Sequence, residues 1–265
     1  MNNKYIGVFD SGMGGLTVVK CIAENMPDES IIFFGDTAHV PYGTRSAEQI
    51  TEYVLNDVRF LNTFDVKAVV IACNTADSIA GEQVKELYTF PVFGVIEPAA
   101  KEAAAVTQNN KIGVIATNAT VNSGAYEKNI ARFNPSAQVT CVACPKLVPL
   151  IEDGHFQKGD SDIENTLAEY LMPLKKQGID TVVLGCTHYA LLYDIIADML
   201  PEVNIVVSSF AVTKVLKNEL IKADMQSSSK ESERRYFVSG DAEHFESTAK
   251  DFMGGLCEKV VHAEI

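Results

Sequence analysis

The feature that most constrains the fold of this chain is a short segment that occurs twice. Residues 69–75 (VVIACNT) and 182–188 (VVLGCTH) align without a gap, 113 positions apart, and each is an apolar run that leads into a cysteine. A second pair, residues 6–9 (IGVF) and 112–115 (IGVI), repeats at nearly the same interval of 106 positions. Short apolar runs bounded by turn residues are typical of buried parallel strands. The chain is therefore predicted to contain two related α/β halves.

Each repeated cysteine follows a predicted strand and precedes a predicted helix. Cys73 comes after the strand at 68–72, and Cys186 comes after the strand at 181–184. Ligands of open α/β sheets bind at the carboxyl ends of the strands, where loops and helix N-termini present free N–H groups. Each half thus supplies one thiol. Inversion of a carbon centre, with a proton removed from one face and another added to the opposite face, is a natural use of such a pair.

Composition narrows the class of protein. A chain of 265 residues with 47% apolar and 22% charged residues is an ordinary globular protein that can bury a sizeable core. The formal net charge of −13, without a lysine and arginine cluster, argues against nucleic acid or an anionic membrane as the main partner. Polar residues follow Met1, and no apolar run approaches the ~18 residues of a membrane span, so a cytoplasmic protein is expected. The sequence leaves the oligomeric state open, and a homodimer is compatible with it.

The six cysteines are expected to be free thiols, because their number and spacing differ from the dense framework of a small secreted domain. Cys141 and Cys144 form a lone C-x-x-C, which is compatible with a redox pair or half of a zinc site. Neither role is favoured, since there is no second such pair and Pro145 follows directly. Cys21, in an apolar helical pattern, and Cys257, near the C-terminus, are expected to be structural.

The remaining elements repeat the same plan. Predicted strands of the first half are residues 4–9, 30–34, 68–72 and 91–95, and those of the second are 111–116, 138–142, 181–184 and 203–207. The main predicted helices are 16–25, Ser46 to about 64, 123–133, 160–178 and 210–223, with a polar loop at 117–120. A strand at 236–239 and a helix after Asp241 have no counterpart in the preceding half and are expected to complete the first domain.

The fold class expected from this order is α/β, with two pseudo-symmetric open-sheet domains and the active site in the cleft between them. The first domain is predicted to comprise residues 1–96 plus 210–265, with Asp10 and Cys73. The second is predicted to comprise residues 97–209, with Cys186 and His188.

Four motifs at strand ends carry a resemblance to a known family: FDSGxGGL at 9–16, GDTAxVPYG at 35–43, ACNTA at 72–76 and LGCTHY at 184–189. Taken alone, the glycine-rich first motif is a weak nucleotide signal, because it is neither G-x-G-x-x-G nor a P-loop. Together the motifs resemble the glutamate racemases of the aspartate/glutamate racemase superfamily over nearly the full chain. Two positions differ from the residues expected in many members of this family. His39 stands where arginine or another residue is expected, and Ala190 stands where proline commonly follows the Thr-His-Tyr sequence.

The resemblance implies interconversion of L- and D-glutamate without a cofactor or a metal, to supply D-glutamate for peptidoglycan. Removing an α-hydrogen without a pyridoxal group requires a strong base, neutralised carboxylates and a site closed to water. A thiolate can be that base if a helix N-terminus or a nearby donor lowers the thiol pKa of ~8.5 or assists deprotonation. By resemblance, Cys73 acts on the D-enantiomer and Cys186 on the L-enantiomer.

The resemblance also implies helpers and binding groups. Asp10 would assist Cys73, and His188, with Glu152 behind it, would assist Cys186. Taken alone, Asp10 is better explained as a loop or capping carboxylate and His188 as an interior histidine, but beside paired thiols the functional interpretation is favoured. Hydroxyl, amide and backbone N–H groups at the strand ends would bind the substrate without an arginine clamp. These candidates are Ser11, Pro41, Tyr42, Gly43, Asn74, Thr75, Thr117, Thr120 and Thr187.

Three alternatives remain open at this point. The same scaffold serves racemases of other substrates, such as aspartate, so glutamate rests on the family motifs. A thiol-disulfide enzyme would form a reversible bond between Cys73 and Cys186. A regulatory binding protein would bind a ligand without turning it over.

Overall fold

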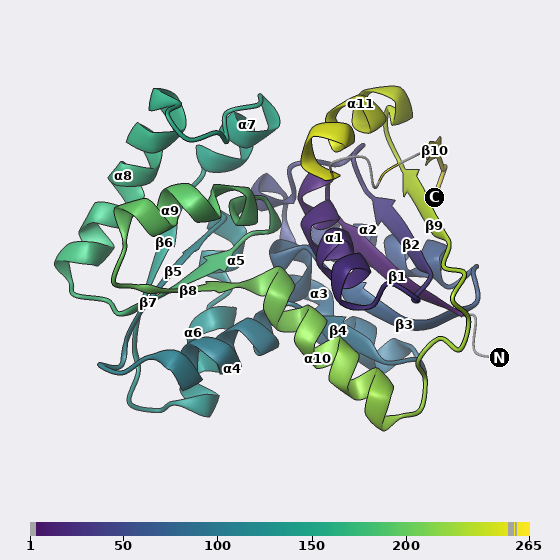
Figure 1. Cartoon of the computed structure of the whole chain (residues 1–265), viewed down its shortest axis with the longest axis horizontal. Coiled ribbons are helices and arrows are strands. Elements are labelled where there is room, and N and C mark those ends of the chain that lie inside the picture. The colour runs from purple at the N-terminus through teal and green to yellow at the C-terminus, as the bar shows by residue number, and fades with distance from the viewer. Residues whose placement is uncertain (1–3, 254–256, 258) are drawn as a thin grey trace.

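Two open sheets of parallel strands form the frame of the molecule in the computed structural model, which describes residues 4–253, 257 and 259–265 (Figure 1). The first sheet has the strand order β10-β9-β2-β1-β3-β4, and the second has the order β6-β5-β7-β8. The bounds in the first sheet are β1 Tyr5–Asp10, β2 Ile31–Gly35, β3 Val66–Ile71, β4 Val92–Gly94, β9 Arg234–Val238 and β10 Val260–His262. Those in the second are β5 Lys111–Ala116, β6 Gln138–Ala143, β7 Thr181–Gly185 and β8 Asn204–Val207.

Helices cover the sheets and connect successive strands. Those associated with the first half are α1 Leu16–Asn25, α2 Ala47–Leu61, α3 Asn74–Leu87 and α11 Ala242–Met253. The others are α4 Ile96–Val106, α5 Asn118–Asn122, α6 Ala125–Phe133, α7 Leu147–Glu152, α8 Ser161–Lys176, α9 Tyr193–Met199 and α10 Ser208–Lys222. The described residues also form the short 3₁₀ helices η1 Met13–Gly15, η2 Tyr42–Thr44 and η3 Thr187–Leu192. None of the helices in the described part of the chain is long and apolar enough to span a membrane.

The sequence repeat is a repeat of structure. The strand order β2-β1-β3-β4 in the first sheet is the same as β6-β5-β7-β8 in the second. Gly7 pairs with Val69 and Gly113 pairs with Val182, which are the positions that the two sequence echoes align. The expected α/β fold with two open parallel sheets is confirmed. The chain passes between the sheets through α4 and α10, which contact each other, and we propose that these crossings mark the domain boundaries.

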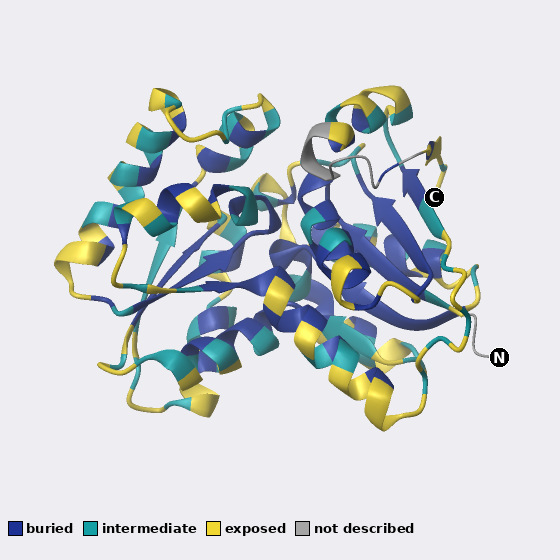
Figure 2. Cartoon of the chain, in the orientation of Figure 1, coloured by how far each residue is buried: buried dark blue, intermediate teal, exposed yellow. Residues whose placement is uncertain are grey.

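Burial explains why these strands are mostly apolar on both faces. Every residue of β2, β3 and β7 is buried, and the strands form the dark interior of both halves (Figure 2). A parallel sheet covered on both faces by helices has no solvent-facing side, so its strands lose the alternation of apolar and polar residues. The helices, by contrast, expose one face.

Local sequence signals set some of the helix ends. Ser46 caps α2 as predicted, in a capping box with Gln49, although α2 ends at Leu61 rather than near 64. The predicted polar loop at 117–120 is wrong in part, because Thr117 caps a short helix, α5. Gly124, with a φ of 66°, separates α5 from α6, so the predicted helix at 123–133 begins only after this left-handed residue.

A buried ion pair ties the segment after α10 to the first sheet. Lys67 in β3 pairs with Glu29, and both residues are 3% exposed. Lys67 Nζ also donates to the carbonyl oxygen of Met225 at 2.8 Å, and Ser227 N donates to Glu29 Oε1 at 2.9 Å. The pair therefore anchors the chain as it returns from the second sheet to β9.

Removing the lysine should destabilise the protein strongly. We expect Lys67→Met to lower the free energy of unfolding by about 3–5 kcal/mol, because Glu29 is left as an unpaired buried charge. The double variant with Glu29→Gln should recover part of that loss. Lys4→Met is the control, because the exposed pair of Lys4 with Asp65 contributes at most about 1 kcal/mol. Urea denaturation measures all three; a double variant no more stable than Lys67→Met would contradict the interpretation.

Candidate active site

A cavity lies where the two halves meet, at the carboxyl ends of their strands. Its volume is about 140 Å³, and its walls include residues that follow β1, β3, β5 and β7. One water needs about 10–15 Å³ of such space, so the cavity suits a molecule of roughly ten non-hydrogen atoms. The lining residues are Ser11, Val40, Pro41, Tyr42, Gly43, Thr44, Cys73, Asn74, Thr75, Thr117, Asn118, Cys144, Pro145, Val148, Pro149, Cys186, Thr187 and His188.

Cys73 is held at the N-terminus of α3, where it is the N-cap residue. Its sulfur accepts a hydrogen bond from Ala76 N at 3.5 Å and lies 3.4 Å from Ser11 Oγ. Burial, followed by the negative charge of Asp10, raises the pKa of the Cys73 thiol to about 12, against the lowering effect of the Ser11 and Ala76 hydrogen bonds. In the free protein Cys73 is therefore a thiol at neutral pH, ready to give a proton.

Cys186 has a different environment, although it occupies the equivalent place after β7. Its sulfur lies 3.8 Å from Nδ1 of His188, whose Nε2 lies 3.1 Å from Glu152 Oε1. Burial lowers the pKa of His188, but hydrogen bonds and charges from Cys186 and Glu152 outweigh it and raise the pKa to about 10. At neutral pH the ring is an imidazolium, which can donate to the sulfur and stabilise negative charge there.

Asp10 ends β1 and is completely buried beneath the glycine-rich loop. Its Oδ2 accepts hydrogen bonds from Gly12 N at 3.2 Å and Gly15 N at 3.0 Å, and Thr187 donates to Oδ1 at 3.4 Å. Burial raises the pKa of Asp10 to about 6, opposed by His188 and by the loop N–H groups. The charge of Asp10 affects the pKa of Cys73, but the hydrogen bonds of the Cys73 sulfur go to Ser11 and Ala76. The role of Asp10 as a proton acceptor for this thiol therefore stays a prediction.

Gly14 lets the two halves touch beside the cavity. A Cβ atom at Gly14 would lie 2.3 Å from Thr187 Oγ1 and 2.5 Å from His188 Nδ1. Such distances are well inside van der Waals contact, so any side chain would push η1 away from η3. The glycine is required by this close approach, and the approach places the loop after β1 against the loop that carries the second thiol.

Three threonine hydroxyls meet across the other side of the cavity. Thr75 Oγ1 lies 2.9 Å from Thr117 Oγ1 and 3.2 Å from Thr120 Oγ1, and the last two lie 3.0 Å apart. Asn74, next to Cys73, accepts from the Tyr126 hydroxyl at 2.7 Å. The start of α3 thus contacts the second half directly, and its side chains offer polar groups to an anionic ligand.

Most predicted site residues line the cavity. They are Ser11, Pro41, Tyr42, Gly43, Cys73, Asn74, Thr75, Thr117, Cys186, Thr187 and His188. Three others lie behind the wall and contact it: Glu152 through His188, Asp10 through Thr187, and Thr120 through the other two threonines.

Sequence reasoning missed seven lining residues: Val40, Thr44, Asn118, Cys144, Pro145, Val148 and Pro149. Four of them, from Cys144 to Pro149, follow β6, which corresponds to β2 in the repeat. Since the loop after β2 was a predicted wall, the repeat was the signal that could have placed the loop after β6 there as well. Val40, Thr44 and Asn118 are neighbours of predicted residues in the same loops.

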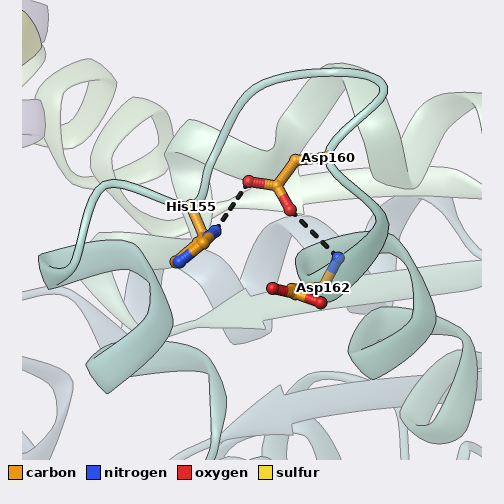
Figure 3. A group of neighbouring side chains, drawn as sticks. All are labelled: His155, Asp160 and Asp162. Carbon is orange, nitrogen blue, oxygen red and sulfur yellow. Dashed lines mark hydrogen bonds and ion pairs between the residues drawn. The ribbon is translucent and has the colours of Figure 1, made fainter.

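A group of polar side chains outside the cavity has a structural explanation. His155, Asp160 and Asp162 come together where α8 begins (Figure 3). Asp160 is the N-cap of α8, accepts from Asp162 N at 3.0 Å and lies 2.7 Å from His155 Nδ1. Helix capping and one ion pair therefore account for this arrangement.

Comparison with known proteins gives a consistent result. Residues 6–216 match the model of the Asp/Glu/hydantoin racemase family. The chain is 44% identical to a glutamate racemase of Geobacter metallireducens, over 95% of this chain and 93% of that one. Its structure is similar to glutamate racemase isoform RacE1 from Bacillus anthracis, with a TM-score of 0.96 and 36% identity over 100% and 99% of the two chains. The glutamate racemase of Francisella tularensis in complex with D-glutamate gives a TM-score of 0.90 at 36% identity over 100% and 98%.

His188 should keep its second proton far above neutral pH. We expect its ¹⁵N NMR signals to titrate near pH 10, and Glu152→Gln to lower that midpoint, because the carboxylate stabilises the imidazolium. A folded-state pKa above 6.5 stabilises the protein below pH 6.5, and this stabilisation is lost as pH rises toward 10. His188→Asn assigns the signals and should flatten the pH dependence of stability between those values. Titration of the ring near pH 6.5 would contradict the assignment.

Proposed function

The chain belongs to the Asp/Glu/hydantoin racemase family, and we propose that it is a glutamate racemase that interconverts L- and D-glutamate through two cysteine side chains. The observation that carries the proposal is that Cys73 and Cys186, one from each half of a duplicated fold, line the same small cavity. The bound D-glutamate named for the Francisella tularensis structure supports glutamate as the substrate. In the cell, the product D-glutamate would serve peptidoglycan synthesis.

The proposed reaction uses one sulfur as base and the other as acid. With L-glutamate, Cys186 as a thiolate removes the α-hydrogen, and the Cys73 thiol gives its proton to the opposite face of the carbanion. With D-glutamate the roles reverse. The protonated His188 would stabilise a thiolate at Cys186 while Cys73 keeps its proton, and a free protein in that form would react with L-glutamate. Asp10 would accept the proton of Cys73 when D-glutamate is the substrate.

The cavity can neutralise the substrate carboxylates without arginine or lysine. Among the described residues that line it, His188 is the one side chain that carries a positive charge. Hydroxyls of Ser11, Thr75 and Thr117 and the N-terminus of α3 provide hydrogen bonds and a favourable dipole for anions. The carbanion formed at the α-carbon spreads its charge onto the adjacent carboxylate, so donors at that carboxylate stabilise the transition state more than the ground state.

The first test is racemisation itself. Purified protein incubated with L-glutamate in deuterated water, without any added cofactor, should yield D-glutamate that carries deuterium at the α-carbon. Chiral chromatography with mass detection measures both. Inactivity until pyridoxal phosphate is added, or faster turnover of aspartate than of glutamate, would overturn the proposal.

Single cysteine variants should separate the two directions. Cys73→Ser keeps Cys186 as base and should retain some hydrogen exchange with L-glutamate, whereas Cys186→Ser should favour exchange with D-glutamate, since serine is a far weaker base. Racemisation should collapse in both variants. Asp10→Asn and His188→Asn should show the same opposed bias, with losses of about 10²–10⁴. Cys21→Ser, at a buried position in α1, is the control; full racemisation by either active-site variant would exclude the two-thiol assignment.

A further inference from the structure

A buried cluster of hydrogen bonds lies behind one wall of the cavity. Tyr42 is part of that wall, and its hydroxyl contacts two carboxyl groups, Asp36 Oδ2 at 2.6 Å and Asp57 Oδ2 at 3.1 Å. Asp36 directly follows β2, and Asp57 lies on α2. Both carboxyl groups are completely buried, and neither belongs to the cavity lining. The catalytic steps proposed above use neither of them.

The protons of this cluster can be counted. Burial, followed by the neighbouring carboxyl groups, raises the pKa of Tyr42, so its hydroxyl keeps its single proton and donates one hydrogen bond. Asp36 has two further partners: His39 Nδ1, which lies 2.8 Å away and donates when its proton is on that nitrogen, and Ser239 Oγ, which donates at 2.7 Å. The Ser239 hydroxyl oxygen accepts from Ala38 N, which leaves its proton for Asp36. Asp36 thus accepts the short hydrogen bond from Tyr42 and one from Ser239, and lies within reach of His39.

The contact between Asp57 and Tyr42 then needs a second proton. The phenol proton is directed to Asp36, so the phenol oxygen can only accept from Asp57. Asp57 Oδ1 has no hydrogen-bond partner among the described residues, and an ionised carboxylate with a bare, buried oxygen is very costly. Burial, followed by the charges of Asp36 and Asp10, raises the pKa of Asp57 well above its ordinary value, against the lowering effect of the Tyr42 hydrogen bond.

We infer that Asp57 is a neutral carboxylic acid in the folded protein and donates its proton to Tyr42 Oη, and that this hydrogen bond positions the cavity wall formed by residues 40–44. Where it concerns activity, the inference rests on the proposed racemase function. Asp57 is a positioning residue, because it reaches the substrate only through Tyr42. A Cβ atom at Gly43 would lie 3.3 Å from Thr117 Cβ in the second half, so a shift of Tyr42 changes both the wall and the contact between the halves.

The proton can be observed directly by infrared spectroscopy. At pH 8, Asp10 and Asp77, whose pKa values burial raises to about 6, are ionised, so the carboxylic acid C=O band of Asp57 is not masked by them. We expect Asp57→Asn to abolish this band and Asp36→Asn to leave it present. A band unaffected by Asp57→Asn, or one lost only in Asp36→Asn, would overturn the inference. This measurement needs no substrate and so does not depend on the proposed function.

The positioning role is tested by a pair of near-isosteric substitutions. In Asp57→Asn the amide can still donate to Tyr42, so activity should stay within about threefold of wild type. Asp57→Leu keeps the shape but lacks a donor, and we expect a KM for both L- and D-glutamate raised about tenfold, as for loss of one buried hydrogen bond, with a smaller change in kcat. Asn56→Ala is the control. Asn56 precedes Asp57 on α2, and among the described contacts its side chain forms a hydrogen bond only with the exposed Arg59.

The outcomes separate this inference from the proposed function. Equal loss of α-hydrogen exchange from L- and D-glutamate distinguishes a displaced wall from the opposed bias in exchange expected of the cysteine variants. An unchanged KM in a folded Asp57→Leu protein, checked by thermal denaturation, would overturn the positioning role. A wild-type protein that does not racemise glutamate would overturn the proposed function, while the infrared band would still decide the protonation of Asp57.

Discussion

The cavity depends on the close approach of two loops that belong to different sheets. Gly14 after β1 lies directly against Thr187 and His188 after β7, at distances that no side chain would allow. This contact brings the carboxyl ends of both sheets to one place, and with them the two thiols. In a doubly repeated α/β fold each half ends in a similar loop, but only opposed halves can present equivalent groups to both faces of a single carbon atom.

The duplicated fold does not produce equivalent chemistry at its two thiols. Cys73 faces a serine hydroxyl and lies within reach of the negative charge of Asp10, which holds it as a thiol. Cys186 faces the protonated ring of His188, which stabilises negative charge on its sulfur. The backbone is therefore repeated, while the charge beside the two sulfurs is not: Cys73 lies near a carboxyl group and Cys186 beside an imidazolium.

Burial also decides where protons reside around the cavity. Asp10, Asp36 and Asp57 are all completely buried in the first half. They lie close to the cavity that is proposed to bind an anionic substrate. Three ionised carboxylates there would repel the substrate and oppose formation of a thiolate. Loop N–H groups and His188 oppose the effect of burial on Asp10, Tyr42 and Ser239 donate hydrogen bonds to Asp36, and a retained proton neutralises Asp57. The cavity can then bind carboxylates without lysine or arginine in its walls.

The sequence by itself determined the repeat, the succession of strands along each half and the position of both thiols at strand ends, because apolar runs of strand length and turn residues are local signals. It also indicated the loops after β1, β2, β3, β5 and β7 as the walls of a site. Only the tertiary structure decided that the loop after β6 joins them, that Gly14 is a contact between halves, and that Tyr42 shares its hydroxyl with Asp36 and Asp57. These features depend on distances between residues far apart in the chain, and on desolvation that shifts protons only once the segments are packed together.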